Sequence, residues 1–295
     1  MKEGKASYTA EVMAIRRAVE SMRPESERVC YDPLAVNFIR TQFRIIGRSR
    51  LLTRMAVWYA DERRVPGGFG YVVARVRYID DYLKTCMADG IGQLVILGAG
   101  YDTRPYRFDE LKGRAKVFEV DHADTQKTKM EKLRKMFGSL PDHVVYVPID
   151  FNKDKLDKRL YESGYDRNLK TLFIWEGVTY YIPAEAVDET LSFVANNSGE
   201  GSSIVFDYLV ESDEYEKSEQ LFIERVQKIH KRIGELLIFG IPNGTIEEFL
   251  SRRGFCQIEN ASVDYLKKAY FNGRNQRRKV FASMAIVHAT VKPRG

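Results

Sequence analysis

Five short apolar segments, separated by helical segments, constrain the fold of this chain most. They are QLVILGAG, KVFEVD, VVYVPID, TLFIWEGV and SSIVFDYL, which begin at residues 93, 116, 144, 171 and 202. Each is apolar almost throughout instead of alternating, which is typical of strands buried on both faces. Helical stretches such as HADTQKTKMEKLRKMFG lie between them. The pattern therefore predicts an α/β fold with a mainly parallel sheet covered by helices.

The chain before these strands has helical periodicity. YTAEVMAIRRAVESM places Val12, Ile15, Val19 and Met22 at steps of three and four, which predicts one buried helix face. DPLAVNFI predicts a second helix with Asp32 as its cap, and GYVVARVRYIDDYLKTCM predicts a third. We expect these segments to form a helical cap.

After the fifth apolar segment the pattern changes. A charged helical stretch over 211–235 interrupts the alternation, and TIEEFLSRRGF resumes a helix. FCQIENASV and KVFASMAIVHATV then predict two closing strands, joined by a stretch in which we expect no apolar helix. If these strands pair as a hairpin, one strand of the sheet is antiparallel. We predict one domain over 1–295: a helical cap (1–90), a core (91–210), and a lid helix with closing strands (211–295).

Composition restricts the partners and the compartment. The net charge is +6, but 41 acidic residues are interspersed among 47 basic ones. The basic segments Arg40–Arg54 and Lys267–Lys279 are therefore interpreted as solvated surface, and we expect no nucleic-acid partner. The 3 cysteines have no paired spacing, which predicts neither a disulfide framework nor a zinc site. Without an apolar leader or a membrane-length apolar run, the chain is expected to be cytoplasmic, with no membrane partner and no metal.

The first strand ends in a glycine turn, LVILGAGYDTRPYRF. In open parallel sheets, ligands bind beyond the carboxyl ends of the strands, where Gly98 and Gly100 would lie. A phosphate-binding loop is excluded because no G-K-[ST] follows. A dinucleotide fingerprint needs a third glycine at the position where this chain has Thr103. This difference weakens the argument for a nicotinamide cofactor.

Acidic residues follow the strand ends. Asp121 ends the second strand and could accept from both ribose hydroxyls of an adenosine cofactor. Asp150 and Phe151 follow the third strand, and Glu176 follows the fourth. These carboxylates and Asp102 would repel a pyrophosphate. They are compatible with a cofactor that carries an ammonium and a sulfonium group.

The ordered series GYVVARVRYIDDYL, LGAGYDTRPYRF, FEVD, PIDF and FIWEGVTYYI resembles the leucine carboxyl methyltransferase family, from about Thr9 to Val210. The family includes an enzyme that methylates the C-terminal leucine of a phosphatase subunit, and polyketide O-methyltransferases. The resemblance implies a Rossmann-like, class I methyltransferase sheet and the cofactor S-adenosylmethionine.

The resemblance also implies residue roles. Arg75 would pair with the methionine carboxylate by two parallel bonds, and Arg17, or its neighbour Arg16, would reach the same group. Gly98 would lie against the methionine moiety and Glu176 near its ammonium. Asp121 would hold the ribose hydroxyls, and Asp150 and Phe151 would frame the adenine. The predicted cofactor-binding set is Arg17, Arg75, Gly98, Gly100, Asp102, Asp121, His122, Asp150, Phe151 and Glu176.

We therefore expect an O-methyltransferase that acts on a carboxylate or hydroxyl of a small organic acceptor. Tyr180, Tyr181 and the 211–235 helix are expected near the acceptor, and the arginines of DTRPYR favour an anionic one. A protein C-terminus stays open as an acceptor. His230 is interpreted as a surface histidine. Two alternatives remain at this point: a nicotinamide-dependent oxidoreductase, and a nucleic-acid-modifying protein suggested by the basic pI alone.

Overall fold

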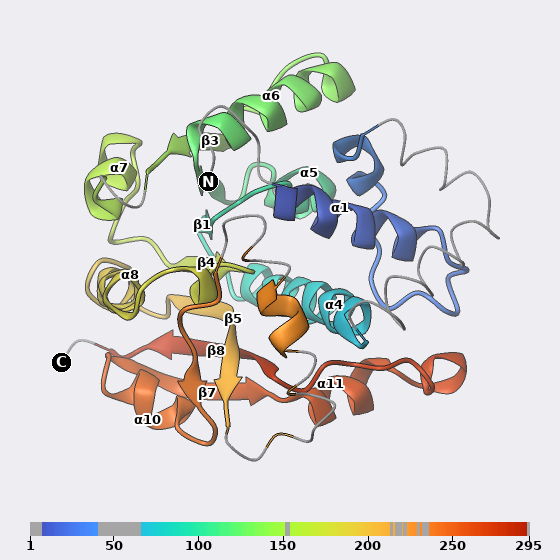
Figure 1. Cartoon of the computed structure of the whole chain (residues 1–295). Coiled ribbons are helices and arrows are strands. Elements are labelled where there is room, and N and C mark those ends of the chain that lie inside the picture. The colour runs from blue at the N-terminus through green and yellow to red at the C-terminus, as the bar shows by residue number, and fades with distance from the viewer. Residues whose placement is uncertain are drawn as a thin grey trace.

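The computed structural model describes residues 8–40, 66–150, 154–212, 215, 220, 223–228, 231 and 236–293. Its centre is an eight-stranded sheet with the strand order β3-β2-β1-β4-β5-β8-β7, and with β6 paired to β5 (Figure 1). The strands are β1 (Gln93–Leu97), β2 (Lys116–Asp121), β3 (Val144–Pro148), β4 (Thr171–Trp175), β5 (Ser203–Glu211), β6 (Ile241–Pro242), β7 (Phe255–Ala261) and β8 (Met284–Val291). The first five correspond to the five apolar segments predicted as strands, with β5 extending two residues beyond its segment.

The strand directions confirm a mostly parallel sheet with one antiparallel strand. β1 pairs in parallel with both β2 and β4, and the parallel arrangement continues to β3 and β5. β8 runs antiparallel to its neighbours β5 and β7. Strand order reverses between β1 and β4, so the carboxyl ends of these two strands border the crevice in which a ligand is expected.

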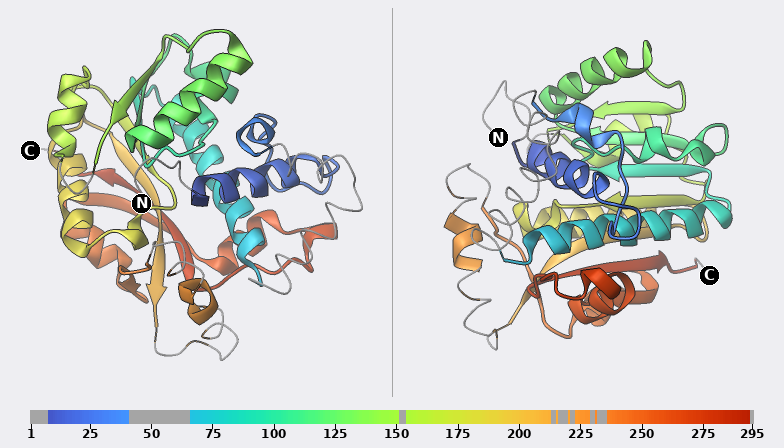
Figure 2. Two further views of the ribbon diagram at one scale, coloured as in Figure 1. Left: turned by 45° about the horizontal axis from the view of Figure 1, so that its top comes forward. Right: turned by 90° about the vertical axis from the view of Figure 1, so that its right-hand side faces the viewer.

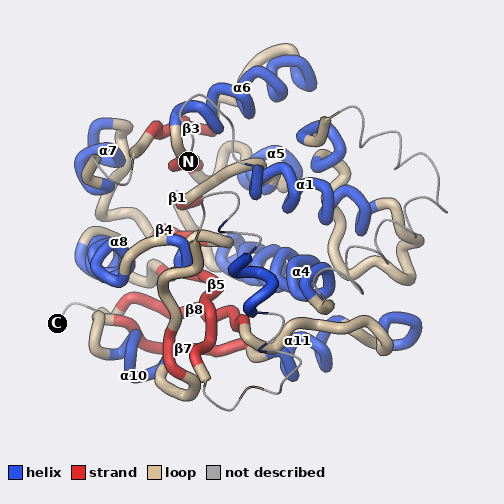
Figure 3. The backbone as a smooth tube through the Cα atoms, in the orientation of Figure 1, coloured by secondary structure: helices blue, strands red, loops and turns tan. Residues whose placement is uncertain are grey.

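Helices cover both faces of the sheet (Figures 2 and 3). On one face lie α1 (Tyr8–Ser21), α4 (Gly68–Ala88), α5 (Arg104–Arg107), α6 (Ala123–Phe137) and α11 (Val263–Tyr270). On the other lie α7 (Leu156–Glu162), α8 (Ala184–Asn196) and α10 (Ile246–Ser251). Successive β1 side chains serve opposite faces: Leu94 and Ile96 pack toward α4, and Val95 and Leu97 toward α8. Short 3₁₀ turns are η1 (Ala35–Phe38), η3 (Asp109–Leu111), η4 (Thr179–Tyr181) and η5 (Gly273–Asn275).

The connection between β7 and β8 differs from the prediction, because it contains the helix α11. The helix begins after Ser262, whose side chain accepts a hydrogen bond from the backbone of Tyr265. It buries only Val263 and Leu266, and its other residues are largely polar. Two apolar residues three positions apart are enough to dock one short helix, but they give a weak helical signal in the sequence.

The N-terminal segments also differ in detail from the helices predicted for them. α1 buries Ala14, Arg17, Ala18 and Glu20. Ile15 and Val19 of the predicted face pack against the core, whereas Met22, just beyond the helix, is exposed. The reason is polar: Arg17 is paired with Asp32, which turns this side of the helix inward. Asp32 also accepts from the backbone amides of residues 34 and 35, but the turn it caps is the 3₁₀ turn η1, not an α-helix.

In the part of the chain that the structure describes, no helix has the length and the apolar character needed to cross a membrane. Residues 41–54 of the first basic segment lie outside the described residues, as does His230.

Candidate active site

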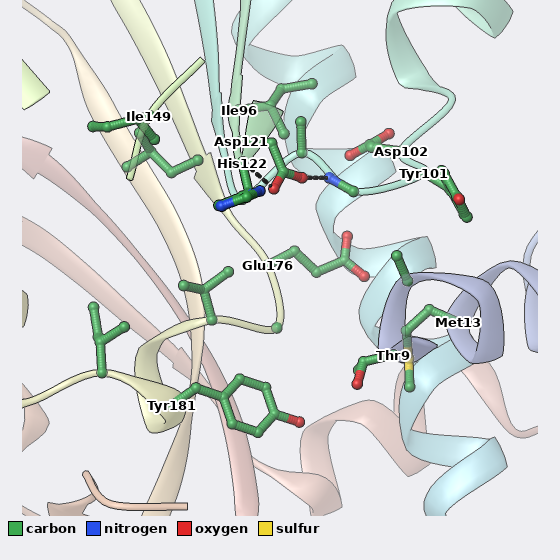
Figure 4. A pocket seen from close by; sticks show the side chains of 18 of the residues that line it. Thr9, Met13, Ile96, Tyr101, Asp102, Asp121, His122, Ile149, Glu176 and Tyr181 are labelled. Carbon is green, nitrogen blue, oxygen red and sulfur yellow. Dashed lines mark hydrogen bonds between the residues drawn. The ribbon is translucent and has the colours of Figure 1, made fainter. Parts of the chain in front are cut away.

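A cavity of about 530 Å³ lies beyond the carboxyl ends of β1, β2 and β4 (Figure 4). The glycine turn after β1 and the turn after β4 contribute to its walls. α1 supplies a further wall through Thr9, Ala10, Met13 and Arg17, of which the sequence analysis predicted only Arg17. The N-terminal helix is thus part of the site.

The glycine turn lets the backbone come close to its surroundings. Gly98 has a φ of +68°, and a Cβ placed on it would lie 2.4 Å from Cγ2 of Val178. Gly100 has a φ of +43°, and a Cβ there would lie 3.3 Å from Cβ of Ala10. Both glycines line the cavity, so a larger residue at either position would take space from the ligand or from the facing wall.

The four predicted strand-end carboxylates, those of Asp102, Asp121, Asp150 and Glu176, all line this one cavity. Asp121 is fixed by two backbone amides: Gly100 donates to Oδ2, and His122 donates to Oδ1 at 2.6 Å. Burial raises the pKa of Asp121 above its ordinary value, although both amides act in the opposite direction. The carboxylate keeps capacity to accept further bonds, because each oxygen has two lone pairs.

Glu176 is held between two guanidinium groups. Its Oε1 accepts from Arg75 Nε at 2.9 Å, and its Oε2 accepts from Arg104 Nη1 at 2.7 Å. Burial pushes the pKa of Glu176 up, but Arg104 and Arg75 push it down by more, so the group is ionised and its pKa lies below the ordinary value. Its position is therefore set by ion pairs on both oxygens.

The arginines of DTRPYR do not face the acceptor, which corrects the prediction. Arg104 is 2% exposed and pairs with Asp80 at 2.7 Å and Asp102 at 2.6 Å, besides Glu176. Arg107 pairs with Asp80 at 2.6 Å. These cations compensate buried carboxylates and so cannot support a preference for an anionic acceptor. Burial raises the pKa of Asp102, but Arg104 and Lys129 lower it by more and bring it to about 2.

Arg75 lines the cavity, as predicted, but its contacts differ from the predicted two-bond grip. Nε donates to Glu176, and Nη1 donates to Asp207 at 2.5 Å. Nη2 lies 3.8 Å from Sδ of Met13, another lining residue. In this conformation Nη2 is the nitrogen left to face a ligand. Arg77, the other arginine of ARVR, pairs with Asp81 on the exposed side of α4.

The structure distinguishes Arg17 from its neighbour Arg16. Arg17 lines the cavity and donates to the carbonyl oxygen of Tyr101 at 2.5 Å, whereas Arg16 donates to the carbonyl oxygen of Gly68. Of the two tyrosines predicted near the acceptor, Tyr181 lines the cavity, whereas the buried Tyr180 does not, because its hydroxyl is held by Arg75 and Asp207. His122 lines the cavity and caps α6, with Nδ1 accepting from the amide of residue 124 at 3.3 Å. Phe151 lies outside the described residues.

The cavity wall beyond Gly177 is mainly apolar. Val178, Ile182, Pro183, Leu236 and Ile238 line it, together with the Tyr181 ring. In Figure 4, the hydroxyl of Tyr181 points into the cavity toward the side of Thr9 and Met13. Leu236 and Ile238 are 50% and 54% exposed, so large apolar side chains stand at the mouth. Most of the predicted 211–235 helix lies outside the described residues, although 223–228 are helical.

Sequence reasoning missed two residues of this network, Arg104 and Asp207. Asp207 sits in the middle of β5 and is fully buried, with Gly177 and Arg75 as partners. A charged residue inside an otherwise apolar strand must be paired, and this signal was available in IVFDYL. For Arg104 no local signal existed, because two of its partners, Asp80 and Glu176, come from distant segments. Among the described residues, no group of three or more His, Cys, Asp or Glu side chains is placed to hold a metal ion.

Comparisons with known proteins show the family of the chain. The family model described as leucine carboxyl methyltransferase matches residues 10–195. The chain is 34% identical over 220 residues to YktD of Bacillus subtilis, covering 75% of this chain and 72% of YktD. It is 26% identical to a protein of Mycobacterium sp. (strain JLS), covering 95% and 94%. The names of both relatives assign them to the S-adenosyl-L-methionine-dependent methyltransferases.

A solved structure extends the likeness in fold to the whole chain. A DUF574 family protein from Streptomyces avermitilis superposes with a TM-score of 0.62 at 13% identity, covering 99% of each chain. The chain therefore belongs to the leucine carboxyl methyltransferase family and is an S-adenosylmethionine-dependent methyltransferase.

Proposed function

We propose that this enzyme transfers the methyl group to an oxygen atom of a small organic acceptor, in the first place a carboxylate. The observation that carries the proposal is the division of the cavity into two halves. Charged groups gather around Asp121, Glu176 and Arg75, and apolar side chains gather around Tyr181 and Ile238. The first half suits the cofactor, and the second suits the organic body of an acceptor.

The residues of the first half fit S-adenosylmethionine. Among the described lining residues, four carboxylates face two guanidinium groups, an acidic balance that favours a ligand with sulfonium and ammonium charges. Gly98 lines this half, and the absence of a Cβ lets its backbone approach Val178 and the bound ligand closely. When bound, the cofactor supplies a methyl group on a positively charged sulfur, so alignment of the acceptor is the main task of the protein.

The geometry supports one orientation of the cofactor. Asp121, fixed by two backbone amides, would accept from the ribose hydroxyls, with Asp150 and His122 on the adenine side. Glu176 and Arg75 would hold the ammonium and the carboxylate of the amino-acid end. In this orientation Gly177 and Tyr181 would line the part of the cavity that receives the acceptor.

An ionised oxygen is the acceptor that such a site favours. Sulfonium and carboxylate attract each other strongly in a cavity of low effective dielectric constant, and both charges disappear on transfer. The preference for an anion then rests on the cofactor itself, because Arg75 and Arg17 are already paired with carboxylates. A carboxylate is ionised at neutral pH, whereas a phenol with a pKa of about 10 needs a base.

Turnover measured against pH tests the proposal. Aromatic and aliphatic carboxylic acids, the matching phenols and alcohols, and a short peptide with a free or an amidated C-terminus are screened as acceptors. For a carboxylate we expect a methyl-transfer rate nearly flat between about pH 6 and pH 9, since the nucleophile does not titrate there. A rate that rises steadily with pH on a phenol, with no transfer to any acid, would reject the carboxylate and leave a hydroxyl acceptor.

A further inference from the structure

Asp207 is a fully buried carboxylate of β5 that does not line the cavity but contacts residues that do. Its Oδ1 accepts from the backbone amide of Gly177 at 2.6 Å, and its Oδ2 accepts from Arg75 Nη1 at 2.5 Å. The Tyr180 hydroxyl lies 3.4 Å from Oδ2 and 3.3 Å from Arg75 Nη1. One side chain thus links the middle of α4 to the turn that follows β4.

The backbone of Asp207 strengthens the same link. Its carbonyl oxygen accepts from the Thr179 hydroxyl at 2.5 Å. The side chain and the backbone of Asp207 therefore both bind the segment 177–180. This segment leads directly into Tyr181. An ionised group inside a sheet is costly unless its partners compensate it, and Asp207 has both a cation and a backbone donor.

The link also reaches the mouth of the cavity. The carbonyl oxygen of Tyr180 accepts from the amide of Ile238 at 2.9 Å. Ile238 and Tyr181 both line the apolar half. The contacts of Asp207 therefore connect the residues proposed for the amino-acid end of the cofactor with the wall proposed for the acceptor.

We propose that Asp207 is a positioning residue for methyl transfer: it holds Arg75 and the 177–181 turn in the arrangement that binds the amino-acid end of the cofactor. The inference rests on the proposed function, namely on the orientation that places the ribose at Asp121 and the amino acid at Arg75. Asp207 acts through these residues and does not contact the ligand.

A matched reference lies in the same sheet. Glu119 of β2 is also fully buried and pairs with Lys129 at 2.8 Å, and it accepts from the Tyr106 hydroxyl at 2.9 Å. Neither Glu119 nor Lys129 lines the cavity. Replacing Glu119 by glutamine therefore removes a buried carboxyl group and its pairing with Lys129 without touching the cavity wall, as expected for a purely structural contact.

The experiment measures binding of two probes by calorimetry. S-adenosylhomocysteine has adenine, ribose and the amino-acid end, whereas adenosine lacks the amino-acid end. Both are titrated into the wild type and into Asp207→Asn, Glu119→Gln and Asp121→Ala. We expect Asp207→Asn to weaken S-adenosylhomocysteine by about tenfold or more and to leave adenosine unchanged, since breaking a buried charge pair has effects of that order. Glu119→Gln should change neither affinity, and Asp121→Ala should weaken both.

The outcomes separate this inference from the proposed function. If Asp207→Asn weakens both probes equally, or neither, Asp207 has no specific part at the amino-acid end and the inference is overturned. The same holds if Glu119→Gln reproduces the selective loss. If Asp121→Ala leaves adenosine binding unchanged, the orientation itself is wrong, whatever the result for Asp207.

Discussion

Arg75 and Glu176 lie 101 positions apart in the chain, yet Arg75 Nε donates to Glu176 Oε1 at 2.9 Å. The bond joins the middle of α4 to the turn after β4, and both residues line the cavity. Glu176 also pairs with Arg104, and Arg75 also pairs with Asp207. A short chain of alternating charges thus fixes two walls of the site relative to each other before any ligand is bound.

Replacing Arg75 by lysine should weaken binding of S-adenosylhomocysteine. A guanidinium reaches Glu176 and Asp207 with separate nitrogens, whereas an ammonium is a single point of donation and cannot span both. We expect a loss of about 1.5–3 kcal/mol in binding free energy, as for a hydrogen bond to a charged group. Calorimetric titration of the purified variant measures it.

Arg77→Lys is the control for this prediction. Arg77 is on the same helix, but its side chain is 46% exposed and paired with Asp81. Its replacement should change the affinity by no more than about 0.5 kcal/mol. A loss confined to Arg77→Lys would show that the wrong arginine of ARVR had been assigned to the cofactor.

Cofactor affinity should fall on acidification at a higher pH than an ordinary aspartate would predict. Burial raises the pKa of Asp121, and hydrogen bonds from ribose hydroxyls favour its ionised form, so binding requires the loss of a proton once the pH drops through this raised pKa. The pKa values of Asp102 and Glu176 are lowered, and both groups stay ionised in that range.

Binding of S-adenosylhomocysteine is followed between about pH 7 and pH 4, with circular dichroism to confirm that the fold persists. In Asp121→Asn the affinity should be weaker at neutral pH and should lose this pH dependence. An unchanged pH profile in the variant would assign the titration to another group.

The sheet was predictable because parallel strands buried on both faces are apolar throughout. KVFEVD matches β2 residue for residue, and the strand-end carboxylates converge as expected, since carboxyl ends of parallel strands share one edge. The convergence needed no knowledge of side-chain contacts.

The pairing of charges was not predictable in the same way. Arg104 follows the glycine turn, and arginine is a residue type usually found at the surface. It is buried here because it pairs with Asp80 of α4 and with Glu176, which come from distant parts of the chain. Met13 and Thr9 reach the cavity because α1 packs close to Gly100, a contact between segments 90 residues apart that no local pattern encodes. Such long-range contacts determine which side chains face the ligand.

The stability of the protein should depend on Glu119 near neutral pH. Burial raises the pKa of Glu119 to about 7, although Lys129 and Tyr106 act in the opposite direction. Because the folded pKa lies above the unfolded one, the contribution of Glu119 is full below the unfolded value of 4.5 and is lost as the pH rises through about 7.

Denaturant unfolding at several pH values measures this effect against Glu119→Gln, which cannot titrate. Relative to the variant, the wild type should lose stability as the pH rises through that window, by at most about 1.4 kcal/mol per pH unit. A stability difference that is constant over the window would contradict the assignment.

Gly98→Ala should impair both folding stability and cofactor binding. The position has a φ of +68°, which costs an L-residue about 1–2 kcal/mol, and the added Cβ would lie 2.4 Å from Cγ2 of Val178. Valine is β-branched and adapts poorly, so the turn or the facing wall must shift.

Gly113 is the matched control, because it has a φ of +74° with no atom within 4 Å of an added Cβ. Gly113→Ala should lose only the backbone contribution in denaturant unfolding and keep full affinity for S-adenosylhomocysteine, whereas Gly98→Ala should lose more stability and also affinity. Equal losses of stability with affinity retained in both variants would show that Gly98 serves the turn alone and that its closeness to Val178 has no role in the cofactor site.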